Sequence, residues 1–154
     1  MRNRSRPFAG LSKTIFAAFA TLGLIGAAAP GGVTVTVKVT DLRDMKGTIR
    51  GCITSDAKEF PDCRKDGPSQ QLVIPAKGDD VLRFTGVKPG TYAIALLHDE
   101  NDNGKMDKKL LFMPKEGYGF SRDAPVRMAP PKFEAARFDV AGAPISLTIK
   151  MRYM

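Results

Sequence analysis

Short segments in which apolar and polar residues alternate constrain the fold more than any other feature of this sequence. The clearest runs from Ile145 to Tyr153, where five apolar or aromatic residues alternate with Ser, Thr, Lys and Arg. A period of two gives a strand one buried face and one wet face. Segments with strand character, separated by glycine, proline and polar turns, span 33–40, 47–54, 70–74, 81–87, 91–97, 133–140 and 145–153. They predict an all-β chain folded as an antiparallel β-sandwich of about seven strands, with an open-ended barrel as the alternative.

Two regions depart from simple alternation. Segment 91–97 is apolar on both faces, which predicts a central strand buried on both sides. Residues 110–131 are rich in glycine and proline and predict a brief strand at 110–113. A compact loop is expected next, held by Tyr118 and Phe120, because glycines stand on both sides of Tyr118.

The first thirty residues have the character of a secretory leader. Four basic residues, the last of them Lys13, precede an uncharged apolar run from Ile15 to Ala29 that ends in small side chains. This pattern predicts a signal peptide over residues 1–28, cleaved after Ala28 or Ala29, followed by one sandwich domain over 33–154. The protein is therefore expected to be exported, either periplasmic or secreted. An uncleaved membrane anchor is the alternative, although the run is short for a bilayer.

Export changes what the charge and the cysteines mean. The whole chain carries +8, but without the leader's four basic residues 20 Lys and Arg remain against 16 Asp and Glu, a net +4. That modest charge predicts no nucleic-acid partner. Cys52 and Cys63 are the two cysteines, and in an oxidising compartment they predict a disulfide. A redox-active pair, the alternative, is typically spaced more closely.

One loop carries the pattern of a calcium ligand set. Asp99, Asn101 and Asn103 place an oxygen side chain at every second position, Gly104 follows, and Asp107 lies eight residues after the first. Glycine at the sixth position permits a sharp turn, and the seventh residue offers its backbone carbonyl. The EF-hand scheme needs Glu at its twelfth position, where this chain has Leu. The predicted ligands of a weakly bound Ca²⁺ are Asp99, Asn101, Asn103, the carbonyl of Lys105, Asp107 and Glu116. A solvated hairpin turn at Asn103-Gly104 is the alternative.

Two motifs together resemble a known bacterial family. His98-Asp-Glu-Asn-Asp-Asn-Gly-Lys-Met-Asp107 and Pro114-Lys-Glu-Gly-Tyr-Gly-Phe-Ser121 are similar to the H-D-x-N-x-N-G-x-x-D and P-x-E-G-x-G-F-S core of small exported proteins classed as a domain of unknown function. The Pro89-Gly90-Thr-Tyr92 turn is similar to one in transthyretin-like and carboxypeptidase-regulatory-like β-sandwiches. The resemblance covers roughly residues 33–152. It implies an exported Ig-like or transthyretin-like sandwich and supplies no activity.

The sequence contains no complete catalytic constellation, and no catalytic residue is assigned. We expect a non-catalytic exported module that binds or supports an envelope, matrix or surface partner, either a protein or a glycan. Candidate partner-binding residues are His98, Tyr118, Phe120 and Ser121. The alternative is a small periplasmic hydrolase that uses His98 with nearby carboxylates and Ser121. A membrane contact is expected only through an uncleaved leader.

Overall fold

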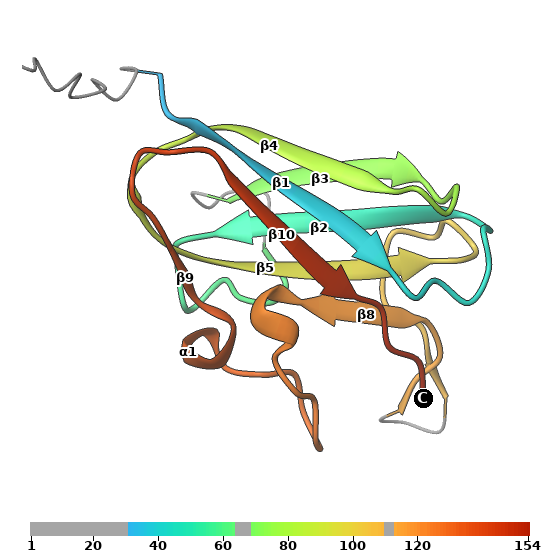
Figure 1. The fold of residues 1–154 in the computed structure, drawn as a ribbon. Helices are drawn as coiled ribbons and strands as arrows, with labels where there is room; N and C mark the ends of the chain where they lie inside the picture. Colours follow the sequence, from blue (N-terminus) through green and yellow to red (C-terminus); the bar gives the residue numbers. More distant parts are fainter. Residues whose placement is uncertain (1–30, 64–68, 110–112) are drawn as a thin grey trace, which may run out of the picture.

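The chain folds as two packed β-sheets (Figure 1). The computed structural model describes residues 31–63, 69–109 and 113–154, so the predicted signal peptide lies outside the described residues. Within these ranges no helix is long and apolar enough to span a membrane. The first sheet has the order β10-β1-β4 and the second the order β3-β2-β5-β8, with β9 also paired to β5. The bounds are β1 Val33–Thr40, β2 Thr48–Thr54, β3 Gln70–Pro75, β4 Val81–Val87, β5 Gly90–Asp99, β8 Gly117–Phe120, β9 Phe138–Val140 and β10 Ile145–Lys150.

The all-β prediction is confirmed, and most predicted strands agree with the observed ones to within a few residues. The alternating apolar residues of β1, β2, β4 and β5 meet between the sheets, as a buried face of period two requires. This main core includes Val35, Val37, Val39, Ile49, Ile53, Leu82, Phe84, Ile94 and Leu96, none more than 3% exposed. Gly51 faces the same space, where a side chain would collide with Leu82.

Strand β5 is central, as its two apolar faces predicted. One face lies in the main core, and the other packs against a second apolar cluster. That second cluster contains aromatic rings from three segments, including Phe60, Phe120 and Phe133, with Ala93 of β5 fully buried beneath them. The rings meet edge to face, which is a favourable aromatic geometry. The strand that precedes the acidic loop is therefore held on both sides.

Three elements differ from the prediction. Residues Phe133–Ala136 form a short helix, α1, because Phe133 and Ala136 both enter the second cluster at a spacing that a strand would place on opposite faces. Residues 117–120 form strand β8 and not a compact loop, and β10 ends at Lys150. Strands β1 and β10 run parallel, and the chain crosses from the second sheet to the first between β9 and β10.

The brief strand expected at 110–113 falls mostly on residues outside the described ranges. Only Met113 of that segment is described. It begins strand β7 (Met113–Pro114), which pairs with β6 (Lys108–Lys109) in a two-stranded ribbon. The ribbon extends from the end of the acidic loop.

The predicted disulfide is present between Cys52 of β2 and Cys63, with Cα atoms 6.2 Å apart. It ties the segment that carries Phe60 to the second sheet. Both cysteines are buried.

Removing this disulfide should lower the free energy of unfolding by about 3 kcal/mol, because the closed loop limits the freedom of the unfolded chain. The double variant Cys52→Ala/Cys63→Ala and the reduced wild type should show the same loss in urea titrations. Thiol labelling of the untreated mature protein should find no free cysteine. Full labelling of both residues without reductant would contradict the bridge.

Candidate metal site

The acidic loop, residues 99–107, is folded around the buried carboxylate of Asp99 at the end of β5. Asp99 Oδ1 accepts the N–H of Asn103 at 3.0 Å, and Oδ2 accepts the N–H of Gly104 at 2.8 Å. Asp102 and Gly104 adopt left-handed backbone angles, with φ of 56° and 81°, and Asn, Asp and Gly tolerate such angles best. The loop therefore curls around its first carboxylate.

Arg50 of β2 holds the other side of the Asp99 carboxylate. Its Nε lies 2.6 Å from Asp99 Oδ2, and its Nη2 lies 3.1 Å from Asp102 Oδ1. Burial by itself would raise the pKa of Asp99, but the Arg50 hydrogen bond and the two backbone N–H groups outweigh it and lower the pKa below its usual value. Asp99 is therefore ionised at neutral pH. The hydrogen bond to Asp99 in turn raises the pKa of Arg50.

Three of the predicted ligand side chains come together on the outside of the loop. Asp107 Oδ2 accepts Asn101 Nδ2 at 2.8 Å, and Oδ1 accepts Asn103 Nδ2 at 2.9 Å. The two amide oxygens instead accept backbone N–H groups of the loop. Asn101 Oδ1 accepts the N–H of Asn103, and Asn103 Oδ1 accepts the N–H of Lys105. A half-turn of either amide would point its oxygen toward Asp107. The loop thus brings together side chains that carry oxygen atoms, which are the ligands that a hard cation prefers.

Glu116, the last predicted ligand, clamps the loop from the neighbouring motif. It is 2% exposed, and its Oε1 accepts the N–H of Glu100 at 3.2 Å while Oε2 accepts the N–H of Asp107 at 2.9 Å. The two ends of the loop are thereby tied to one carboxylate. Both oxygens already accept N–H groups of the loop backbone, so Glu116 fixes the conformation of the loop without a bound ion.

The rest of the second motif anchors this clamp in the sandwich. Gly117 and Gly119 face the main core, where side chains would collide with the Tyr153 ring and with Ile149. Their neighbours Tyr118 and Phe120 face the second cluster. Alternation of glycine with aromatic residues lets one short strand pack closely on both faces. The motif is therefore explained by packing around the loop.

The predicted partner-binding residues do not form an exposed surface. Tyr118 and Phe120 are each 5% exposed, and His98 and Ser121 are fully buried. Ser121 Oγ accepts the N–H of Ile94 at 2.9 Å and donates to the carbonyl of Ala136 at 2.5 Å. The prediction of these four as partner-binding residues is corrected, because all four side chains are buried within the protein.

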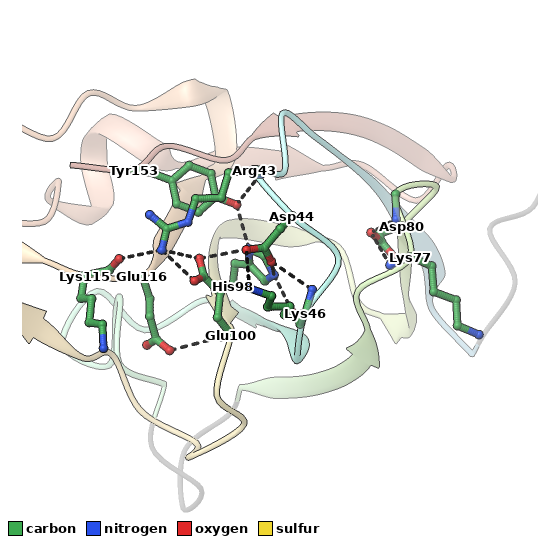
Figure 2. A network of polar contacts seen from close by, with 11 residues as sticks. Arg43, Asp44, Lys46, Lys77, Asp80, His98, Glu100, Lys115, Glu116 and Tyr153 are labelled. Atoms are coloured by element: carbon green, nitrogen blue, oxygen red, sulfur yellow. Dashed lines mark hydrogen bonds and ion pairs between the residues drawn. The ribbon is translucent and has the colours of Figure 1, made fainter.

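His98 joins three segments by hydrogen bonds (Figure 2). Its Nε2 lies 2.8 Å from the carbonyl of Lys46, which can only accept, so Nε2 carries the proton. In the neutral ring, Nδ1 then accepts the hydroxyl of Tyr153, also at 2.8 Å. Burial raises the pKa of Tyr153, which keeps this phenol protonated as a donor. His98 and Ser121 are thus bonded to different partners, and the nucleophile–base pair of the hydrolase alternative is not formed.

Asp44, His98 and Glu100 form a second polar cluster beside the loop, with candidate ligand atoms within 4.8 Å of one another (Figure 2). Asp44 approaches Nε2 of His98 at 4.0 Å, whereas Glu100 approaches Nδ1 at 3.9 Å. The two carboxylates therefore lie beside opposite nitrogens of the His98 ring, and neither ring nitrogen is flanked by both of them.

Arg43 already provides a cation at this cluster. Its Nη2 donates to Glu100 Oε2 at 2.7 Å and to the carbonyl of Lys115 at 3.1 Å, and its guanidinium lies 4.6 Å from the centre of the Tyr153 ring. Nη2 is also 2.6 Å from Glu100 Oε1, although without hydrogen-bond geometry. We assign the cluster as a structural ion-pair network, in which the Glu100 hydrogen bond raises the pKa of Arg43.

Two shallow surface hollows lie away from these residues. One is beside Phe60, Pro131 and Phe133, and the other is beside Pro75 and Asp80. Neither is lined by His98 or Ser121. Their linings therefore supply no link to the candidate catalytic pair.

Sequence reasoning missed three residues that organise the site: Arg50, Arg43 and Tyr153. Each contacts the loop or its support from more than 40 positions away. The available signal for Arg50 was its place on the polar face of a predicted strand, which becomes informative only when the pairing of β2 with β5 is known.

Comparison with known proteins adds a family. No curated protein and no solved structure gives a significant match. A family model matches residues 37–148, which include both motifs, the whole acidic loop and both cysteines. The chain therefore belongs to the family described as an uncharacterized protein conserved in bacteria (DUF2141).

Proposed function

We propose that this chain is an exported, non-catalytic β-sandwich module in which the acidic loop binds Ca²⁺ and which binds or supports an envelope, matrix or surface partner. One observation carries the proposal: the side chains of Asn101, Asn103 and Asp107 meet within hydrogen-bond distance on a loop closed by Asp99 and Glu116. Half-turns of the two amides would direct their oxygens toward Asp107, so the loop can present clustered oxygen donors to a hard cation.

The chemistry of the donor set favours calcium over smaller ions. Ca²⁺ accepts six to eight oxygens in flexible geometry, whereas Mg²⁺ requires a near-ideal octahedron and releases water reluctantly. Asn101 and Asn103 supply amide oxygens after half-turns, Asp107 and Asp99 supply carboxylates, and the carbonyl of Lys105 and water complete the shell. Lys108 and Lys109 next to Asp107 weaken binding modestly, so the expected Kd lies in the range of about 10⁻⁴ to 10⁻³ M that is typical of extracellular modules.

Export and fold kinship complete the proposal. The predicted signal peptide would direct export, and a disulfide between Cys52 and Cys63 suits an oxidising compartment. The Pro89-Gly90 turn joins β4 of the first sheet to β5 of the second. That placement supports a transthyretin-like or carboxypeptidase-regulatory-like relationship, which a solved structure of a family member would test by its strand order.

Calcium should raise the melting temperature of the mature protein by roughly ten degrees. With Kd of about 10⁻⁴ M, about 10 mM Ca²⁺ is a hundredfold excess and adds about 2.7 kcal/mol to the folded state. For a domain of this size that corresponds to the stated shift. Differential scanning calorimetry with Ca²⁺, and with Mg²⁺ at equal ionic strength, measures it, and the Mg²⁺ shift should be much smaller.

A matched pair of variants assigns the shift to the loop. Asp107→Asn should remove most of the calcium shift, whereas Asp79→Asn, an exposed carboxylate outside the loop, should retain it. An unmoved wild-type melting curve would make the loop a polar turn only. Immobilised on a resin, the same two variants test the partner: material retained from the native envelope should elute with chelator and be lost with Asp107→Asn.

A further inference from the structure

We infer that Arg50 is a built-in cation that competes with Ca²⁺ for Asp99 and sets the affinity of the acidic loop; this inference rests on the proposed calcium function. The loop already holds a positive charge at its first ligand position, 2.6 Å from Asp99 Oδ2. The guanidinium also reaches Asp102 and lies along the loop, so that a Cβ at Gly104 would be 3.8 Å from Arg50 Cζ.

The sheet, and not the loop, places Arg50 there. In the antiparallel register of β2 and β5, Arg50 lies opposite Leu97 and Thr48 lies opposite Asp99. Arg50 and Asp99 are therefore diagonal neighbours on one face, within reach of a long side chain. Thr48 Oγ1 donates to Asp102 Oδ1 at 3.0 Å and steadies the other carboxylate that Arg50 contacts. The guanidinium is thus held in place by the two most central strands of the second sheet.

Occupation by Arg50 opposes calcium in two ways. Asp99 Oδ2 already accepts both Arg50 Nε and the N–H of Gly104, so a metal must share or displace these donors. The ligand carboxylates of Asp99 and Asp107 carry two negative charges, and Arg50 offsets one of them. Ligand charge is one of the properties that tune calcium affinity in such loops. Arg50 therefore keeps the loop folded without metal and confines calcium binding to high concentrations.

Arg50→Gln should tighten calcium binding by about tenfold or more, because it removes a charge a few ångströms from the ion. Isothermal titration calorimetry of the mature protein with Ca²⁺ at fixed ionic strength measures the change. Lys108→Gln is the matched control: it removes one positive charge from an exposed position beside Asp107. Solvent and salt screen an exposed charge, so its effect should stay within about threefold.

A second measurement uses the wild type and does not depend on how well Arg50→Gln folds. The ¹⁵N-detected Nε–H signal of Arg50, identified by its absence in Arg50→Lys, should shift or lose its protection from solvent exchange as Ca²⁺ is added. If Arg50 does not compete with calcium for Asp99, the Nε–H signal should stay unchanged as Ca²⁺ is added.

The outcomes separate this inference from the proposed function. Equal calcium affinity in wild type and Arg50→Gln, with an unchanged Nε–H signal, overturns the role of Arg50 and leaves calcium binding intact. Binding by Arg50→Gln but not by wild type supports the role of Arg50 and overturns calcium binding by the natural chain. If the folded variant and the wild type both fail to bind millimolar Ca²⁺, both proposals are overturned.

Discussion

Replacing Asp99 with alanine should lower the free energy of unfolding by about 3 kcal/mol, the low end for breaking a buried ion pair. The carboxylate is fully buried and accepts Arg50 Nε and two backbone N–H groups, all of which lose their acceptor. Arg50 is about one-third exposed, and water that reaches it limits the loss. Urea unfolding of the mature protein without calcium measures the difference.

Asp102→Asn is the matched control for this prediction, because Asn tolerates the left-handed φ of 56° at this position. It removes the other carboxylate that contacts Arg50, but that side chain is 59% exposed and its ion pair is screened. Exposed pairs contribute about 0 to 1 kcal/mol, so the control should stay near the wild type. Equal losses in the two variants would mean that burial of Asp99 contributes nothing.

The Asp99 contribution should disappear in acid. The folded-state pKa of Asp99 is lowered relative to the unfolded chain, in which an aspartate titrates near about 3.9. The stabilisation is therefore fully present above the unfolded pKa and is lost as the pH falls through the folded pKa. The stability difference between wild type and Asp99→Ala should be constant from about pH 7 to pH 5 and should narrow below about pH 4. A difference that widens in acid would contradict the assigned direction.

The elements predicted well were those whose signal is local. Alternation located β1 and β4 residue for residue, because each has one face in the main core. The two apolar faces of β5 predicted its central position, since two layers of side chains cover it. The side chains of Asn101, Asn103 and Asp107 lie close together, because a turn at Gly104 brings alternate residues to one side. Their role as metal ligands stays a prediction.

The features that were missed depend on pairing between distant segments. Arg50 reaches Asp99 only because of the register of β2 and β5, which no local pattern reports. Tyr118 and Phe120 were expected in a compact loop, because the glycines on the inward side of β8 give no apolar alternation. Helix α1 is four residues long, too short to show a helical period.

Gly47→Ala should be as damaging as the loss of Asp99, although Gly47 lies outside both motifs. Gly47 has φ of 63°, which a non-glycine residue adopts at a cost of about 1 to 2 kcal/mol. A Cβ there would also overlap the carbonyl oxygen of Asp99 and would lie 2.8 Å from the carbonyl carbon of Glu100. These are backbone atoms of the loop's first turn, so they can move only by pulling Asp99 away from Arg50. The total loss should be about 3 kcal/mol or more.

Gly86→Ala distinguishes the cost of backbone strain from the cost of steric overlap in Gly47→Ala. Gly86 has nearly the same φ, 67°, but its Cβ would meet no atom closer than 3.5 Å outside its chain neighbours. It should therefore cost only the backbone term of about 1 to 2 kcal/mol. The excess loss in Gly47→Ala over Gly86→Ala in urea titrations measures how firmly the sheet holds the loop. Because the displaced turn carries Asp99, Gly47→Ala should also reduce the calcium shift, which Gly86→Ala should leave intact. Equal losses in the two variants would show that the loop moves freely on the end of β5, and a loop that free could not hold its oxygen donors ready for an ion.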